Sequence, residues 1–295
     1  MVQIDRVEKH TISCNLCGSK KYDVVFEDEL GDSIPPLDHD FSPTTRLTYR
    51  IVRCNNCRLV YTNPMPSISS FYSDTVDEVY IASEMQRKKT AEVVIQDILK
   101  HKPYGHLLDI GCSTGIFLDV ACENFTVEGI ETSLWAQNIA AKKHVVHKIP
   151  LSELELSNVF DVVTMFGVIE HFEDPRAEIM RIHKSMKQGG LLVIYTGDVD
   201  SLMARLLGKR WWWYQGMHTY YFSKVTCAQL LSDCGFTVVQ VKNHAIYFKL
   251  FSLAISMRRY WIGKLLSPLL NLPLAKNLML PLRLNGEMLM FAFKK

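Results

Sequence analysis

The sequence predicts an α/β fold in which helices cover both faces of a doubly wound, mostly parallel sheet. Three observations carry this prediction. Short apolar segments alternate with helical segments between residues 105 and 241, as they do in βαβ units. A glycine loop, 111–115, separates the first apolar strand from the first helix. A further strand, within 160–175, ends in a glycine turn followed by polar residues, and sheets of this type bind ligands at such strand ends.

The composition limits the class of protein. The 295 residues suffice for one large domain with a small appendage, and 48% hydrophobic residues suit a sizeable core. A net charge of +2 gives no global basic field of the kind that favours nucleic acid. The sequence shows neither a signal-peptide pattern nor an apolar run of membrane-spanning length. We therefore expect a reducing, cytoplasmic setting for the eight cysteines.

The N-terminal part contains two pairs of cysteines with two residues between the partners: Cys14, Cys17, Cys54 and Cys57. Two such pairs in turn-like contexts are typical of a closed, four-thiolate zinc site. Strand-like segments at 22–26 and 47–52 lie between the pairs, so a zinc-ribbon domain is expected over 1–63. A site without an open coordination position predicts that the Zn²⁺ serves folding and not catalysis.

A helical linker is expected over 64–104, after the chain-breaking residues NPMP. Tyr72 and Tyr80 lie eight residues apart, close to two helical turns, so a helix would place both on one side. There they either contact a ligand of the main domain or pack the linker against it. A helical period runs from Glu84 to Leu99.

The main domain then follows the predicted alternation of strands and helices. Glu131 ends a second strand, 126–133, about twenty residues after the first, where a carboxylate suits the two hydroxyls of a ribose. The alternative is a surface acid at a strand end. The remaining elements are expected as helices at 116–123, 138–144 and 175–186, a strand end and loop at 148–154, and strands at 191–196, 237–243 and 288–295.

Taken together, residues from Gly105 to about Val241 resemble the class I S-adenosylmethionine (SAM) methyltransferases. The resemblance rests on LLDIGCSTG, Glu131, DVVTMFGVIEHFEDP and the Gly189–Gly190 pair before LLVIYT. It implies a Rossmann-like, seven-stranded sheet in a domain spanning 105–295, with SAM as the cofactor. In that family the glycine loop lies under the methionine portion of SAM, and residues 166–169 lie near the sulfonium. The implied cofactor-binding residues are Asp109, Gly111, Cys112, Gly115, Glu131, Thr132, Leu151, Phe166, Gly167, Tyr72 and Tyr80.

The segment 209–236 indicates the acceptor side. Its first half holds three consecutive tryptophans, and its second half is an amphipathic helix that ends at Gly235. Such an aromatic run either stacks on a sugar or other ring, anchors in a membrane interface, or packs on a hydrophobic ledge.

With the four-cysteine domain included, the chain is similar to the sugar methyltransferases of deoxysugar and polysaccharide pathways. The C-methylating members carry a glutamate, then a histidine, followed after two residues by Tyr-Phe-Ser. His218 and the segment 221–223 match this pattern, but Met217 stands in the place of the glutamate. Those enzymes are also longer, and we do not expect their extra C-terminal domain here. Both differences leave O-methylation of a sugar, or another acceptor, as the expectation.

A hydroxyl acceptor must lose a proton, and histidine titrates in the range needed to take it. His218 is the first candidate for this base and His171 the second. Each has the alternative of a hydrogen-bonded structural histidine.

From Lys242 to Arg283 the chain has seven Lys or Arg and no Asp or Glu, in an otherwise apolar context. This insertion, at about 245–285, predicts a peripheral contact with the inner face of an anionic membrane, where a lipid-linked sugar would be the acceptor. A roof over the acceptor pocket or a homodimer contact is the alternative. For the whole chain, a zinc-ribbon RNA methyltransferase and a non-catalytic SAM-binding protein are the competing interpretations, although the near-neutral charge makes nucleic acid a poor partner.

Overall fold

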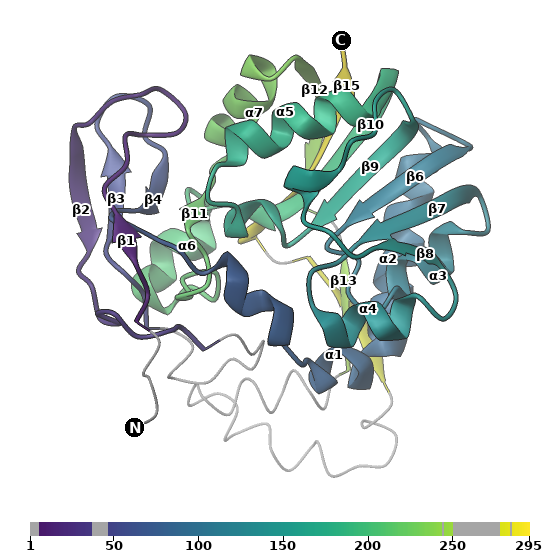
Figure 1. Ribbon diagram of the computed structural model, residues 1–295, viewed down its shortest axis with the longest axis horizontal. Helices are drawn as coiled ribbons and strands as arrows, with labels where there is room; N and C mark the ends of the chain where they lie inside the picture. Colours follow the sequence, from purple (N-terminus) through teal and green to yellow (C-terminus); the bar gives the residue numbers. More distant parts are fainter. Residues whose placement is uncertain (1–5, 37–46, 244, 250–277, 284) are drawn as a thin grey trace.

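A computed structural model describes residues 6–36, 47–243, 245–249, 278–283 and 285–295 (Figure 1). Its centre is a seven-stranded sheet with the order β12-β15-β10-β9-β6-β7-β8. Neighbouring strands from β10 to β8 are parallel, and β15 runs antiparallel to β10 and β12. The predicted doubly wound, seven-stranded fold is therefore confirmed. The strands are β6 (Gly105–Ile110), β7 (Phe125–Ile130), β8 (Val145–His147), β9 (Phe160–Phe166), β10 (Met186–Gly197), β12 (Phe236–Lys242) and β15 (Glu287–Lys294).

Helices cover the two faces of this sheet with separate cores (Figure 1). On one face Ile179 and Leu230 pack with Val163, and on the other Val94 packs with Val162. Consecutive strand residues are thus buried on opposite faces, which is why the central strands read as continuous apolar runs. The main helices are α2 (Glu84–Leu99), α3 (Ile116–Ala121), α4 (Leu134–Ala140), α5 (Pro175–Ser185) and α7 (Lys224–Asp233).

The predicted helix over 138–144 is wrong in its position. Helix α4 begins four residues earlier because the Ser133 side chain accepts a hydrogen bond from the Ala136 amide, an N-cap that fixes the first turn. The prediction followed the apolar period and overlooked this capping residue.

The N-terminal part forms a second, four-stranded antiparallel sheet with the order β11-β4-β3-β2. Its outermost strand, β11, comes from the far end of the methyltransferase-like region (Figure 1). The strands are β2 (Tyr22–Phe26), β3 (Ile51–Cys54), β4 (Val60–Thr62) and β11 (Tyr220–Tyr221), and a separate pair joins β1 (Lys9–His10) to β5 (Met65–Pro66).

The predicted strand over 47–52 is wrong in its first four residues, because β3 starts only at Ile51. The preceding residues pack against the turn that follows β2. The Glu29 amide donates to the Thr48 carbonyl, and the Tyr49 hydroxyl donates to the Ser33 carbonyl.

Two short helices, η2 (Ser69–Asp74) and α1 (Glu78–Ala82), replace the continuous helix that would have placed Tyr72 and Tyr80 on one face. Thr75 is extended and Asp77 caps the Tyr80 amide, so the chain stops and restarts between them. The other short helices are η3 (Leu151–Glu153), η4 (Ile169–His171), α6 (Leu202–Leu207) and η5 (Gly208–Arg210).

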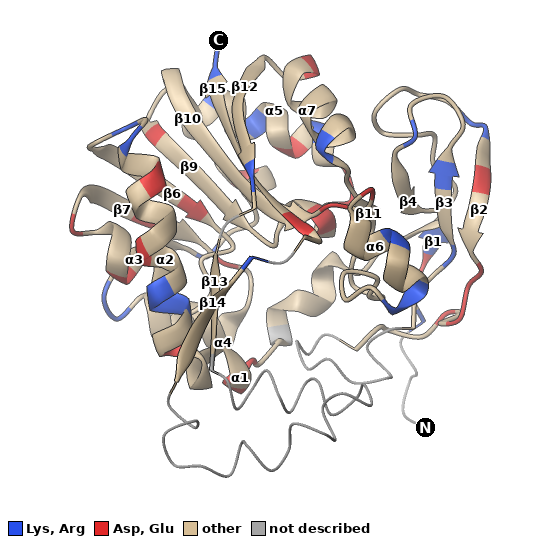
Figure 2. Ribbon diagram, turned by 180° about the vertical axis from the view of Figure 1, so that it is seen from behind, with Lys and Arg blue, Asp and Glu red and all other residues tan. Residues whose placement is uncertain are grey.

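The strands β13 (Ile246–Lys249) and β14 (Met279–Leu282) pair with each other. The Tyr247 amide donates to the Thr90 hydroxyl, which places β13 against α2 (Figure 2). Most of the basic, apolar insertion predicted at 245–285 lies outside the described residues. Among the helices that the structure describes, none has the length and hydrophobicity needed to cross a bilayer.

Candidate active site

The glycine loop after β6 adopts a conformation that demands its glycines. Gly111 and Gly115 have φ values of +72° and +83°. A Cβ atom on Gly111 would lie 2.6 Å from the Val168 side chain. The loop therefore turns tightly beneath the end of β9, with its backbone amides at the carboxyl edge of the sheet.

Glu131 lies directly beside this loop. One of its carboxylate oxygens accepts a hydrogen bond from the Ser113 amide, and the other accepts from the Thr132 and Ser133 amides, all at 2.8 Å. Burial raises the pKa of Glu131, while the three amide donors oppose that shift. The carboxylate is thus fixed in place at the end of β7, where the sequence predicts ribose binding.

Asp109 is fully buried at the end of β6, and Thr164 donates a hydrogen bond to it at 2.6 Å. Burial raises the pKa of Asp109 to about 7, and the bond from Thr164 opposes this only in part. Tyr80 lies near the same loop: burial raises the pKa of its phenol, and Asp109, Cys112 and Ser113 contribute smaller effects. The Arg87 guanidinium is stacked 3.7 Å from the Tyr80 ring centre.

Three other predicted cofactor residues fall into two groups. Phe166 is half-buried against Phe117 with 4.7 Å between ring centres. Leu151 and Cys112 instead point into the two cores. Gly129, which the sequence analysis did not single out, makes room for Cys112, because a Cβ atom there would lie 2.5 Å from the Cys112 sulfur.

The structure brings the two candidate catalytic histidines together. The rings of His171 and His218 meet edge to face with 4.7 Å between their centres. Nδ1 of His218 lies 2.7 Å from the Trp213 carbonyl, and Nδ1 of His171 lies 3.1 Å from the Met217 carbonyl. Because a carbonyl oxygen only accepts hydrogen bonds, we assign the proton of each neutral ring to Nδ1 and the lone pair to Nε2.

Tyr72 belongs to this histidine pair and not to the glycine loop. Its hydroxyl donates to the Met217 carbonyl at 3.0 Å and lies 2.9 Å from Nδ1 of His171. Burial raises the pKa of Tyr72, so the phenol stays neutral. The two linker tyrosines therefore serve two different places, Tyr80 beside the glycine loop and Tyr72 beside the histidines.

Glu170 is a site residue that is not among the residues predicted from the sequence. It is 1% exposed. One of its carboxylate oxygens and one ring nitrogen each from His171 and His218 all lie within 4.8 Å of one another. One oxygen accepts from the Thr196 hydroxyl at 2.9 Å, and the other has no hydrogen-bond partner among the described residues. Burial raises the pKa of Glu170 to about 8.

The tryptophan run packs inward. Trp211 is fully buried, and the Trp212 and Trp213 indoles both point to Glu287, at 2.8 and 3.4 Å. Trp213 also lies against the His218 ring, with 5.3 Å between centres. Of the three sequence interpretations, packing on a hydrophobic ledge is what the described residues display.

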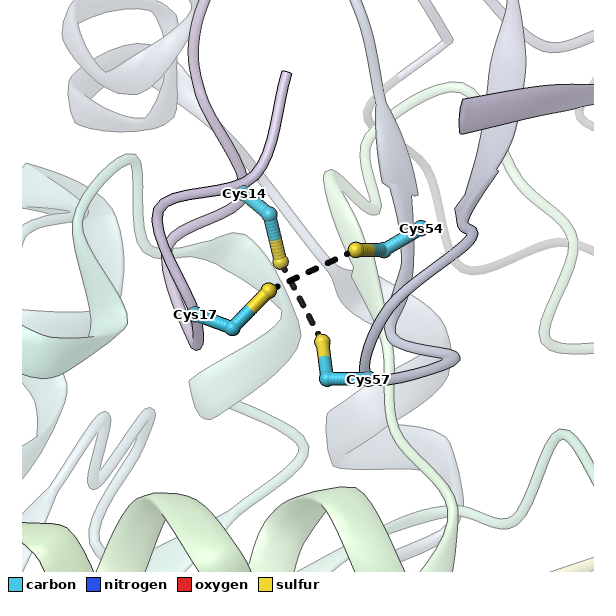
Figure 3. A group of neighbouring side chains, drawn as sticks. All are labelled: Cys14, Cys17, Cys54 and Cys57. Carbon is cyan, nitrogen blue, oxygen red and sulfur yellow. Dashed lines mark hydrogen bonds between the residues drawn. The ribbon is translucent and has the colours of Figure 1, made fainter. Parts of the chain in front are cut away.

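The four cysteines form one compact cluster (Figure 3). Two pairs of sulfurs, one from each turn, lie 3.4 Å and 3.5 Å apart: Cys14 with Cys57, and Cys17 with Cys54. In a tetrahedral site with Zn–S bonds of about 2.3 Å the sulfurs would be about 3.8 Å apart, so the donor set fits Zn²⁺. Both turns close in the same way, with Gly18 and Arg58 at positive φ after the second cysteine of each pair.

Comparisons with known proteins agree with this fold. Residues 82–241, more than half of the chain, match the protein family described as "Methyltransferase domain". A SAM dependent methyltransferase from Archaeoglobus fulgidus superposes with a TM-score of 0.51 over 74% of this chain and 100% of that one, at 18% identity.

Two curated relatives are also similar in sequence. A tRNA U34 carboxymethyltransferase from Colwellia psychrerythraea is 33% identical over 47% of this chain and 46% of its own length. A mitochondrial ubiquinone biosynthesis O-methyltransferase from Schizosaccharomyces pombe is 33% identical over 34% of this chain and 40% of its own length. The chain thus spans less than half the length of either relative. The family match, which includes the glycine loop, Glu131 and the histidine at the end of β9, shows that this chain belongs to the methyltransferase-domain family.

Proposed function

We propose that this protein is a SAM-dependent methyltransferase that methylates a hydroxyl group of a sugar or a lipid-linked saccharide. The observation that carries the proposal is the arrangement at one edge of the sheet. There the glycine loop follows β6, and Glu131, held by hydrogen bonds from backbone amides, follows β7. His171 follows β9, and His218, from the turn before β11, packs against it. One side thus offers a nucleoside-type binding site and the other offers proton acceptors.

SAM, when bound, supplies a methyl group on a sulfonium for in-line transfer, so the protein's main task is alignment. Glu131 would accept hydrogen bonds from the ribose hydroxyls. It already accepts hydrogen bonds from three backbone amides, so its position is set before any ligand binds. Tyr80 and the loop amides around Ser113 would close the other side of that site.

On the acceptor side, Nε2 of His218 would take the proton of the attacking hydroxyl. The oxygen–methyl bond then forms as the sulfur–methyl bond breaks, and the imidazolium returns its proton to solvent. The Nδ1–H bond to the Trp213 carbonyl keeps the His218 ring in the tautomer this step needs. His171 is the second candidate for the same role, with Tyr72 and the Met217 carbonyl fixing its ring.

The choice of a hydroxyl acceptor has support beyond the missing glutamate at Met217. Several sequence relatives are named ubiquinone biosynthesis O-methyltransferases. The sugar class rests on the resemblance of the four-cysteine region together with His218 and residues 221–223.

An RNA acceptor is the second candidate, because one relative is named a tRNA carboxymethyltransferase. The charge distribution argues against it. Lys and Arg are interspersed with Asp and Glu over the described elements (Figure 2), whereas RNA-binding proteins concentrate basic residues on one face.

A screen with methyl-labelled SAM tests the proposal. Nucleotide sugars, lipid-linked saccharides and transfer RNA serve as acceptors for the wild-type protein and for His218→Ala. Label transfer to a sugar hydroxyl by the wild type supports the proposal. Transfer to RNA alone would replace it, and the absence of SAM binding by calorimetry would favour a decayed, non-catalytic site.

A further inference from the structure

The residues that follow His218 are part of the cysteine-bearing sheet. Strand β11 pairs antiparallel with β4, with Tyr220 opposite Tyr61. The Thr62 amide extends this pairing by donating to the Thr219 carbonyl at 2.8 Å. Figure 1 shows β11 between the two sheets, so it is the place where the N-terminal part meets the acceptor side of the site.

The same residues are also bound to the strand end that carries His171. The Thr219 amide donates to the Glu170 carbonyl at 2.8 Å, and the Thr219 hydroxyl lies 3.1 Å from that carbonyl and 3.0 Å from the Phe172 carbonyl. Thr219 therefore has β4 on one side and η4 on the other. Because Thr219 directly follows His218 and Glu170 directly precedes His171, this connection links the backbones that carry the two histidines.

Strand β4 leaves directly from the second cysteine turn. The Cys54 amide donates to the Leu59 carbonyl, one residue before the strand, and the Arg58 amide donates to the Cys54 carbonyl. The position of β4 is therefore tied to the geometry of the cysteine pair that holds this turn.

The first cysteine turn is fixed to the main domain by Arg176 at the start of α5. The guanidinium donates to the Leu16 carbonyl at 2.8 Å and to the Asn15 carbonyl at 3.1 Å. The Asn15 side chain in turn donates to Asp174 at 2.8 Å and accepts from the Arg176 amide at 3.1 Å. A metal ion joining both turns would close a chain of contacts from α5, through the four sulfurs and β4, to β11.

We propose that the four-cysteine site is a positioning site for catalysis: a bound Zn²⁺-type cation holds β4 against β11 and thereby sets His218 relative to His171. This goes beyond a folding role confined to the N-terminal part. It rests on the proposed function only for the chemical role of His218, since the contacts themselves stand without it.

Strand length gives the physical reason why the metal is needed. The strands of this sheet have only two to five residues, and sheets of such short strands gain little from their own pairing and core. A structural zinc site supplies folding free energy directly. Without it, β4 would lose the turn that orients it, and β11 would lose its partner.

Hydrogen–deuterium exchange on the full-length protein tests this without any acceptor. The metal-loaded protein is compared with the same protein after chelation and with Cys57→Ser. We expect protection of the segment 216–223 to fall by at least about tenfold, while the glycine-loop segment 107–113 changes by less than about twofold. SAM affinity by calorimetry should stay within about threefold.

Two pairs of variants sharpen the result. Cys122→Ser, at an exposed cysteine outside the cluster, should leave the segment 216–223 unchanged. Arg176→Ala keeps all four cysteines but removes the contacts to Asn15 and Leu16, and should loosen the segment 216–223 in the same direction. Asp233→Asn removes the ion pair of Arg176 with Asp233 but leaves the contacts of Arg176 to Asn15 and Leu16, and serves as its control.

Three outcomes would overturn the proposal. The first is that the cysteine turns lose protection while the segment 216–223 keeps it. The second is that the segments 216–223 and 107–113 lose protection together, since the metal would then support the whole fold. The third is that the purified protein binds no metal. None of these depends on turnover, so the proposed methyl transfer can fail independently.

Discussion

The imidazole rings of His171 and His218 lie edge to face with 4.7 Å between their centres, although they belong to segments far apart in the chain. His171 ends the helix η4 after β9, and His218 lies in the turn before β11. His171 presents Nδ1 to the Met217 carbonyl and His218 presents Nδ1 to the Trp213 carbonyl, which assigns the lone pair of each neutral ring to Nε2. The proposed function assigns proton transfer to this pair and cofactor binding to the glycine loop.

Substitution of Glu131 tests the cofactor site. Glu131→Ala removes the carboxylate expected to accept two charge-assisted hydrogen bonds from ribose, each contributing on the order of 1.5–3 kcal/mol. SAM affinity measured by calorimetry should fall by at least about tenfold. Glu123→Ala, at an exposed glutamate, is the matched control. An unchanged dissociation constant for Glu131→Ala would make Glu131 a carboxylate that only holds the loop.

Substitution of His218 tests the proposed base. His218→Ala should reduce turnover by roughly 10²–10⁴-fold while SAM affinity is retained. The rate–pH profile should lose the limb that belongs to the histidine. His10→Ala, at an exposed histidine, should behave as the wild type. If His171→Ala abolishes that limb of the profile and His218→Ala does not, then His171 is the base and His218 is not.

Metal analysis tests the cysteine cluster. Freshly purified protein should contain about one zinc ion per chain, and Cys14→Ser should lower both the metal content and the thermal stability. Burial raises the pKa of Cys57 to about 11, whereas hydrogen bonds lower the pKa of Cys17 to about 6 against the effect of burial, so the apo cluster keeps only part of its thiol protons for zinc binding to displace. Metal uptake should therefore release protons, measurable by calorimetry in buffers of different ionisation enthalpy. Protein that is fully folded and free of metal would contradict this prediction.

Asp109 predicts a pH dependence of stability. Burial raises its pKa in the folded protein to about 7, from 3.8 in the unfolded chain. The folded state therefore binds the proton more tightly, and this contribution to stability is complete below about pH 4 and is lost as the pH rises through about 7. Asp109→Asn cannot ionise, so its melting temperature relative to the wild type should be higher at pH 8 than at pH 5. Equal differences at both pH values would show that Asp109 stays ionised in the fold.

Vesicle binding tests whether the basic, acid-free segment 242–283 contacts a membrane or protein. If the acceptor is lipid-linked, the protein should co-sediment with anionic vesicles at low salt and detach at high salt, because exposed charges are screened. Neutral vesicles of the same size are the control. Lack of binding at low salt, together with a stable dimer in solution, would leave the segment as a pocket roof or subunit contact.

The sequence alone determined the features that depend on local spacing. The period of the apolar runs gave the order of strands and helices, and two CxxC pairs gave the four-cysteine cluster. The loop 111–115 required glycine for its backbone angles, which a local pattern can reveal. A capping residue such as Ser133 is also a local signal, and its oversight explains the misplaced start of α4.

Only the tertiary structure decided which of these features meet. The spacing of Tyr72 and Tyr80 does not indicate that Tyr72 contacts His171 while Tyr80 lies near the glycine loop. The reason is that helix η2 ends before the extended Thr75, so the two tyrosines belong to separate helices. The environment of Glu170 likewise depends on burial by neighbours remote in sequence. Strand β11 pairs with β4 across most of the chain, and such long-range pairing follows from the packing of the whole sheet, which local preferences do not encode.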